Sequence, residues 1–274
     1  MPPRRSSPTL CLVLLSALAC ATPGVEEEAR IGEDFAHEIK REVVFLADPL
    51  VAGYVRDLGE RIVAALGPQP FRYDFHVVRD PEVNAFAGPA GHIYIHTGTL
   101  LMARNRAELA GVLAHEVGHV ALRHVAENLA RHRTTGLLRQ AGVAAAGILA
   151  GPAAAGAANL GTGLAAMAVL NSFGREAERE ADAFAVEVLP KVGIDPRGLL
   201  SFFETLRNQD PREPPTFLSS HPATEERIRR TRAMIDSGPL PPGLRFHDGG
   251  RFEIIQQRVR LLTRPRGHLS RRQP

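Results

Sequence analysis

The chain has 274 residues, with 33 basic and 30 acidic side chains and a formal net charge of +3. This length and layout fit one catalytic domain of roughly 200–230 residues. Two of the positive charges, Arg4 and Arg5, lie in a leader that we expect to be removed, which leaves about +1. The basic pI of 9.2 is therefore weak support for a nucleic-acid partner, and we expect none.

The N-terminus reads as a secretory signal over residues 1–19, with two arginines before a short apolar core at residues 10–19. That core is too short for a stable membrane span. Leu18-Ala19-Cys20 resembles a bacterial lipobox, although Ala17 stands where Leu or Val is usual. Two expectations follow: either Cys20 becomes a lipidated N-terminus, with Ala21 directing the protein to the outer membrane, or ordinary cleavage follows Ala19. Cys11 and Cys20 are the only cysteines, so the mature chain would have no disulfide and no thiol metal ligand.

The next segments predict helices followed by strands. Residues 26–66 read as helical, with a break near Asp48-Pro49, and residues 71–79 read as a strand. Residues 84–97 read as a hairpin-like region. After its turn at residues 88–91, residues 92–97 alternate and are rich in β-branched and aromatic side chains, which predicts another strand. His92 and His96 share one face of it; they are a conceivable metal pair, but outward polar positions are the simpler interpretation.

Residues 115–119 form an HExxH motif inside an apolar run, and residues 108–133 read as its helix and extension. His115 and His119 are four residues apart, so on a helix both rings leave the same face and can bind one zinc ion. Glu116 lies beside that face, where it can accept a proton from water at the metal. The alternative is a buried helix with two satisfied core histidines.

A third ligand is expected in the helix predicted over residues 175–185, because catalytic zinc usually has three protein ligands. Glu178 and Asp182 share a face, so Glu178 could bind zinc while Asp182 accepts the free N–H of a ligand histidine. Spacing alone does not choose Glu178 over Glu180. Ala181 and Ala185 would let this helix approach the HExxH helix closely.

Residues 140–174 contain no charged side chain. They read as two short helices packed beside the cleft, as a mobile lid, or as a membrane span interrupted by glycine and proline.

Towards the C-terminus, residues 197–206 and 223–235 read as helices, and His221 precedes Pro222 in a loop. On its own, His221 would be read as an exposed loop histidine. Residues 251–274 are rich in arginine and read as a solvated tail, with contact to anionic lipid as the alternative. We see no repeats after Asp236.

Four ordered segments resemble the HtpX-like and BepA-like zinc metallopeptidases, relatives of the CAAX prenyl endopeptidase. The segments are residues 84–95, 108–124, 175–182 and 220–222, and the resemblance covers roughly residues 30–235. It implies His115, His119 and Glu178 as ligands of one Zn²⁺ per chain, Glu116 as general base, and Asp182 as a support for the ligands. The His-Pro element of the family corresponds to His221 and Pro222, with Arg227 six residues beyond the histidine.

The resemblance also implies a mechanism. Glu116 accepts a proton from a water activated by zinc and passes it to the leaving amine. His221 and Arg227 are the candidate donors to the oxyanion, although His221 could instead close the open position of zinc as a switch. In related peptidases a strand edges the cleft, so an extended substrate is expected to pair with a stretch of five residues. These are Gly91, His92, Ile93, Tyr94 and Ile95.

The sequence thus predicts a mainly helical α+β zincin domain, gluzincin-like, with a small β-sheet and an HExxH helix. We expect a signal peptide at 1–19, the peptidase domain at 26–236 and a basic extension at 237–274. The expected function is a zinc endopeptidase of the bacterial envelope, lipid-anchored in the periplasm, acting on misfolded or misassembled polypeptides. The alternative is a zinc-bound periplasmic chaperone for outer-membrane proteins that cuts little. The sequence does not indicate the oligomeric state.

Overall fold

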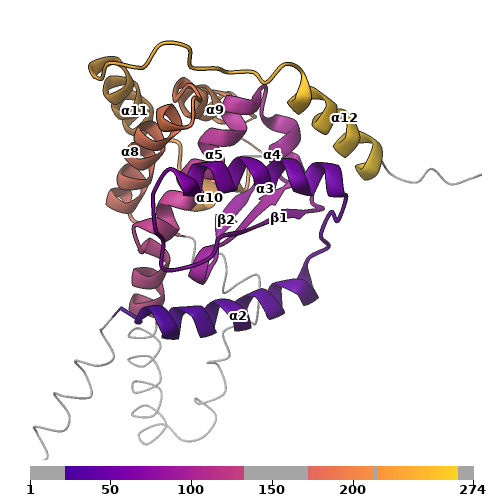
Figure 1. The fold of residues 1–274 in the computed structure, drawn as a ribbon, viewed down its shortest axis with the longest axis vertical. Helices are drawn as coiled ribbons and strands as arrows, with labels where there is room; N and C mark the ends of the chain where they lie inside the picture. The colour runs from indigo at the N-terminus through magenta and orange to yellow at the C-terminus, as the bar shows by residue number, and fades with distance from the viewer. Residues whose placement is uncertain (1–21, 133–171, 211, 213–214, 265–274) are drawn as a thin grey trace, which may run out of the picture.

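A computed structural model describes residues 22–132, 172–210, 212 and 215–264 (Figure 1). Its helices surround a small sheet, as the sequence predicted. In chain order the elements are α2 (Val25–Glu42), α3 (Pro49–Ala64), β1 (Asp74–Val78), β2 (Ala85–Ala87), the 3₁₀ turn η1 (Pro89–Gly91), β3 (His92–His96), α4 (Thr97–Met102), α5 (Arg106–Ala121), α8 (Arg175–Lys191), α9 (Arg197–Arg207), α10 (Phe217–Ser220), α11 (Glu225–Ser237) and α12 (Arg251–Thr263).

The predicted break between the first two helices is confirmed at Asp48 and Pro49. The Asp48 side chain accepts a hydrogen bond from the Val51 N–H, and Pro49 occupies the first helical turn, where its missing N–H costs nothing. The two helices then separate: α3 packs on β1, while α2 packs on η1 (Figure 1).

The sheet has the order β1-β3-β2. β1 runs parallel to β3, with Asp74 opposite His92, and β2 runs antiparallel to it, with Ala85 opposite Ile95. The expectation that the strand after Gly91 edges the cleft is therefore wrong. Both sides of His92, Ile93, Tyr94 and Ile95 are already paired, so an added strand cannot bond there. The edge next to the HExxH helix is β2, which contacts α5.

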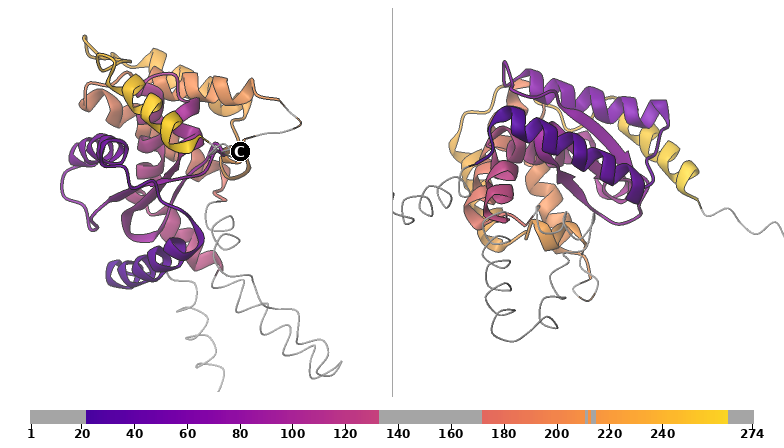
Figure 2. Two further views of the ribbon diagram at one scale, coloured as in Figure 1. Left: turned by 90° about the vertical axis from the view of Figure 1, so that its right-hand side faces the viewer. Right: turned by 90° about the horizontal axis from the view of Figure 1, so that it is seen from below.

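The HExxH helix α5 is buried on all sides, because α8 and α9 pack closely against it (Figure 2). A Cβ on Gly111 would lie 2.7 Å from the Leu199 Cα, and one on Gly198 would lie 2.3 Å from the Ala107 carbonyl carbon. Only glycine permits this approach of α5 and α9. Ala181 and Ala185 of α8 are fully buried, as expected from their size.

The C-terminal helix α12 is part of the domain. Phe252, Ile255 and Val259 are buried in the main apolar core, and the Gln256 amide donates to the carbonyls of Leu100 and Ala103, which lie at the end of α4. The prediction of a solvated tail from residue 251, and of a separate extension from residue 237, is therefore wrong over α12. The segment contains many charged residues, but its apolar residues recur at helical spacing and form one buried face.

Other expectations fall on residues outside the described ranges: the signal at 1–19, Cys20, most of the uncharged 140–174 segment and the end of the basic tail at 265–274. Within the described part of the chain, no helix combines the length and apolarity needed to cross a membrane.

Candidate metal centre

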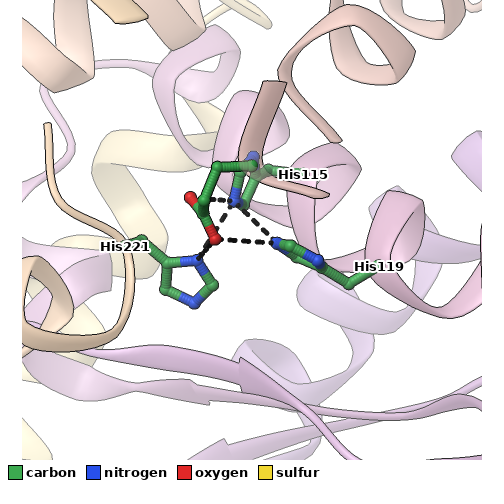
Figure 3. A group of neighbouring side chains, drawn as sticks. His115, His119 and His221 are labelled. Atoms are coloured by element: carbon green, nitrogen blue, oxygen red, sulfur yellow. Dashed lines mark hydrogen bonds and ion pairs between the residues drawn. The ribbon is translucent and has the colours of Figure 1, made fainter. Parts of the chain in front are cut away.

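Four buried side chains converge from three parts of the chain. His115 and His119 come from α5, Glu178 from α8, and His221 from the loop after α10. One ligand atom from each lies within 4.8 Å of all the others, and no other such group of three or more occurs among the described residues. Figure 3 shows the three imidazole rings turned towards one another.

The spacing of these atoms fits a metal ion. His115 Nε2 lies 3.1 Å from His119 Nε2 and 3.2 Å from His221 Nδ1, which in turn lies 2.9 Å from Glu178 Oε1. His119 Nε2 lies 3.4 Å from the same carboxylate oxygen. Ligands about 2.0–2.1 Å from a tetrahedral ion stand about 3.3 Å apart, close to these distances. The residues present therefore fit a metal bound by nitrogen and oxygen.

The structure places Glu178, and not Glu180, in this cluster. Glu178 is 2% exposed, whereas half of the Glu180 side chain faces solvent. Asp182 lies one turn beyond Glu178 and approaches the other nitrogen of His115, with Oδ1 3.0 Å from Nδ1. That is the contact predicted from the spacing, and it leaves Nε2 of His115 facing the cluster.

Arg227 holds the two carboxylates. Its Nε and Nη2 donate to the two oxygens of Asp182 at 2.8 and 2.7 Å, and its Nη1 lies 2.6 Å from Glu178 Oε2 and donates to the Pro222 carbonyl at 3.0 Å. Burial is the largest single influence on the pKa of Asp182 and raises it, but the hydrogen bonds and charges of Arg227 and His115 together outweigh burial, and the pKa ends below its ordinary value. In this structure the guanidinium of Arg227 is engaged by these partners, and its expected role as a donor to an oxyanion stays a prediction.

Glu116 is fully buried beside the cluster, and both of its carboxylate oxygens lack a hydrogen-bond partner among the described residues. The ring of His221 lies beside it, with Nε2 3.6 Å from Oε1. Burial raises the pKa of Glu116, while His221 and His115 lower it in part. An unpartnered buried carboxylate is costly, so its place beside the cluster calls for a functional explanation.

Two neighbours of His119 were not expected from the sequence. The ring of Phe173 stacks on His119 with centroids 3.7 Å apart, and His124 Nδ1 lies 3.1 Å from His119 Nδ1. His124 falls within the resembling segment, but a spacing of five residues on one continuous helix gave no reason to pair it with His119. His92 and His96 lie in β3 and are not members of the cluster.

An open pocket of about 340 Å³ reaches the cluster from outside, and Glu178 and Arg227 form part of its wall. The remaining lining residues come from both sides of the cluster: Phe173, Arg175, Arg179, Pro222, Thr224 and Glu226.

Comparisons with known proteins agree with this geometry. The chain is 31% identical over 218 residues to the beta-barrel assembly-enhancing protease of Yersinia pestis, covering 78% of this chain and 45% of that protein. It is 34% identical over 169 residues to the metalloprotease LoiP of Escherichia coli, covering 62% of this chain and 64% of LoiP. The mitochondrial metalloendopeptidase OMA1 of Schizosaccharomyces pombe is 32% identical over 185 residues, covering 66% and 52% respectively.

The chain thus spans about half the length of the longer relatives it matches. The family described as Peptidase family M48 matches residues 49–235, a stretch that contains every member of the cluster. The chain therefore belongs to peptidase family M48 and is a metallopeptidase.

Proposed function

We propose that this chain is a zinc-dependent endopeptidase of the cell envelope that hydrolyses peptide bonds in misfolded or misassembled proteins. The observation that carries the proposal is the buried cluster of His115, His119 and Glu178 beside the unpartnered carboxylate of Glu116. The name of the Yersinia relative, a protease that enhances beta-barrel assembly, supports an envelope substrate. The leader at residues 1–19 and Cys20 support export and a lipid anchor.

Zinc suits the donor set. Imidazole and carboxylate ligands at tetrahedral spacing, without a thiolate, match catalytic zinc sites built from two histidines and one glutamate. When bound, zinc polarises the scissile carbonyl and lowers the pKa of water at the site.

The protein's own residues supply positioning and proton transfer. Glu116 accepts a proton from the attacking water and delivers it to the leaving amine; burial without a partner keeps the carboxylate basic enough for this task. Asp182 fixes the tautomer of His115, and Arg227 holds Asp182 and Glu178 in place.

His221 restrains the enzyme in this conformation. Its Nδ1 lies among the candidate ligand atoms, so with a metal bound His221 would hold a fourth ligand position and exclude water and the substrate carbonyl from it. Of the two roles left open by the sequence, the geometry favours the block. His221 follows a four-residue helix and stacks on the buried ring of Phe217, so activation would require the loop to leave these contacts.

The outer edge of β2 is the place we propose for an extended substrate. The Asn84 carbonyl accepts from the His96 N–H, and the Gly88 N–H donates to the His92 carbonyl, so the backbone groups of residues 84, 86 and 88 face β3. The backbone groups of Ala85 and Ala87 therefore point to the opposite side; both residues are buried in this conformation, so a polypeptide would add there by β-augmentation only once this edge opens. Such pairing reads the backbone, which suits unfolded chains of varied sequence.

The test compares the wild type with Glu116→Gln and His221→Ala, measuring zinc content and cleavage of casein. We expect about one zinc per chain in all three proteins. Cleavage should fall about 10²- to 10⁴-fold in Glu116→Gln, because general-base catalysis is lost while the ligands remain. Cleavage should rise in His221→Ala.

Each alternative has a distinct signature. Cleavage that survives in Glu116→Gln would refute the assigned base, and cleavage lost in His221→Ala would make His221 a transition-state donor. Bound zinc without cleavage in any variant would favour the chaperone alternative, whereas a wild type without zinc would overturn the proposal.

A further inference from the structure

The two ligand histidines of the HExxH motif are supported differently. His115 meets a carboxylate directly, with Asp182 Oδ1 3.0 Å from its Nδ1. The corresponding atom of His119 meets a third imidazole, His124, at 3.1 Å. The other nitrogen of His124, Nε2, lies 2.9 Å from Glu180 Oε2. The contacts thus run from the cluster through buried His124 to Glu180, whose side chain is 52% exposed.

A break in the helix makes this contact possible. Residues five apart on a continuous α-helix point about 140° away from each other, so His124 would face away from His119. Here α5 ends at Ala121, Arg123 takes a left-handed conformation with φ of 65°, and residues 124–132 form a new helical stretch. The turn returns His124 to the ring of His119.

Contacts from α2 hold that turn. The guanidinium of Arg123 lies 2.9 Å from the buried carboxylate of Glu28 and donates to the Pro23 carbonyl at 2.6 Å. A left-handed conformation at a residue other than glycine persists only where its surroundings fix it. The position of His124 is therefore built into the fold.

The hydrogen-bond directions follow from the ligand role of His119. For Nε2 to bind a metal, the neutral ring carries its proton on Nδ1 and donates it to His124 Nδ1. The proton of His124 then lies on Nε2 and is donated to the Glu180 carboxylate. All bonds point outwards, and Phe173 stacked on the His119 ring limits its rotation.

We propose that His124 and Glu180 are positioning residues that fix the tautomer and ring plane in which His119 binds the metal. This inference rests on the proposed zinc site. Neither side chain touches the substrate or the reacting atoms, so both act through His119.

The chain of contacts from His119 through His124 to Glu180 is called the relay below. Zinc affinity, measured by competition with a chromophoric chelator, tests whether this relay supports metal binding. Loss of such a supporting partner typically weakens metal binding about 10- to 100-fold, and we expect this in His124→Phe. His124→Asn should lose less, because its amide oxygen can still accept from His119. Glu180→Gln should weaken binding by a smaller factor, while Glu187→Gln, an exposed glutamate on the same helix, should match the wild type.

Two further readouts separate positioning from general structural damage. Glu180→Gln should have no additional effect in the His124→Phe background, because its influence passes through His124. In the metal-free protein, imidazole ¹⁵N shifts should show that His119 of the wild type carries its proton on Nδ1. In His124→Phe the shifts should show a mixture of the two neutral tautomers, with the proton on Nδ1 in some molecules and on Nε2 in others. Urea unfolding of the metal-free variants checks that each remains folded.

Equal zinc affinities in the folded variants, or an unchanged His119 tautomer, would overturn the relay while leaving the proposed function intact. An additive Glu180→Gln effect would also refute it. A wild type that binds no zinc would overturn the proposed function and, with it, the purpose of the relay.

Discussion

Two arginine–aspartate pairs join helices that are distant in the sequence, and their surroundings differ. Arg227 donates to both oxygens of Asp182, and the side chains are 6% and 2% exposed. Arg258 donates twice to one oxygen of Asp48, with exposures of 47% and 9%. The first pair lies next to the candidate metal centre, because Arg227 also contacts Glu178, whereas the second links α12 to the start of α3 at the surface. The buried pair adds little net stability, because the cost of desolvating both charges offsets their attraction. Removing one partner is nevertheless costly, because the other charge then stays buried without a partner.

Removing one arginine from each pair should show this difference directly. In metal-free protein, Arg227→Met leaves the buried carboxylates of Asp182 and Glu178 without their cation, and we expect a loss of about 3–5 kcal/mol of unfolding free energy. Arg258→Met removes a surface partner and should cost about 0.2–1 kcal/mol. Urea denaturation of both variants in the presence of a chelator provides the measurement. Similar losses in the two variants would contradict the distinction.

The surface pair accompanies an apolar contact that should matter more than the pair itself. Ile255 of α12 is 2% exposed within the main core, while its neighbour Ile254 is 56% exposed. Ile255→Ala should destabilise the protein by about 2–5 kcal/mol, because it leaves a cavity. The matched variant Ile254→Ala should stay within about 0.5 kcal/mol of the wild type. Equal unfolding midpoints for the two variants would mean that α12 is an appendage, as the sequence suggested.

Features set by local sequence patterns were predictable, whereas features set by contacts between distant segments were not. The HExxH helix, the break at Asp48 and the small residues of α8 are local patterns, and the structure contains each of them. The order of the strands is not local: the sequence indicated a hairpin-like region over residues 84–97, but it could not say that β1 would pair in parallel on the other side of β3. The apolar face of α12 was overlooked because arginines dominate its composition, although Phe252, Ile255 and Val259 follow helical spacing.

Site residues divide in the same way. The spacing in the motif selected His115, Glu116 and His119, but the choice of Glu178 over Glu180 needed the packing of α8 on α5. Arg227 was expected near the metal in a different role, since nothing in the sequence shows that Asp182 and Glu178 would occupy its guanidinium. His124 depended on the left-handed turn at Arg123, which no pattern predicted.

The smallest expected effect is the pH dependence of the surface pair. Hydrogen bonds from Arg258 hold the pKa of Asp48 below its ordinary value of 3.8, although burial opposes them. A lowered folded-state pKa means that the unfolded chain binds the proton more readily. The contribution of the ionised Asp48 to the free energy of unfolding is therefore present above pH 3.8 and is lost as the pH falls through the folded-state value.

Asp48→Asn keeps an acceptor for the Val51 N–H but removes the charge. Urea denaturation from pH 7 down to pH 3 should therefore give a gap of about 0.2–1 kcal/mol between wild type and variant at neutral pH. That gap should begin to close only near pH 3.8. A gap that stays constant to pH 3 would show that the helix cap, and not the ion pair with Arg258, sets the contribution of Asp48.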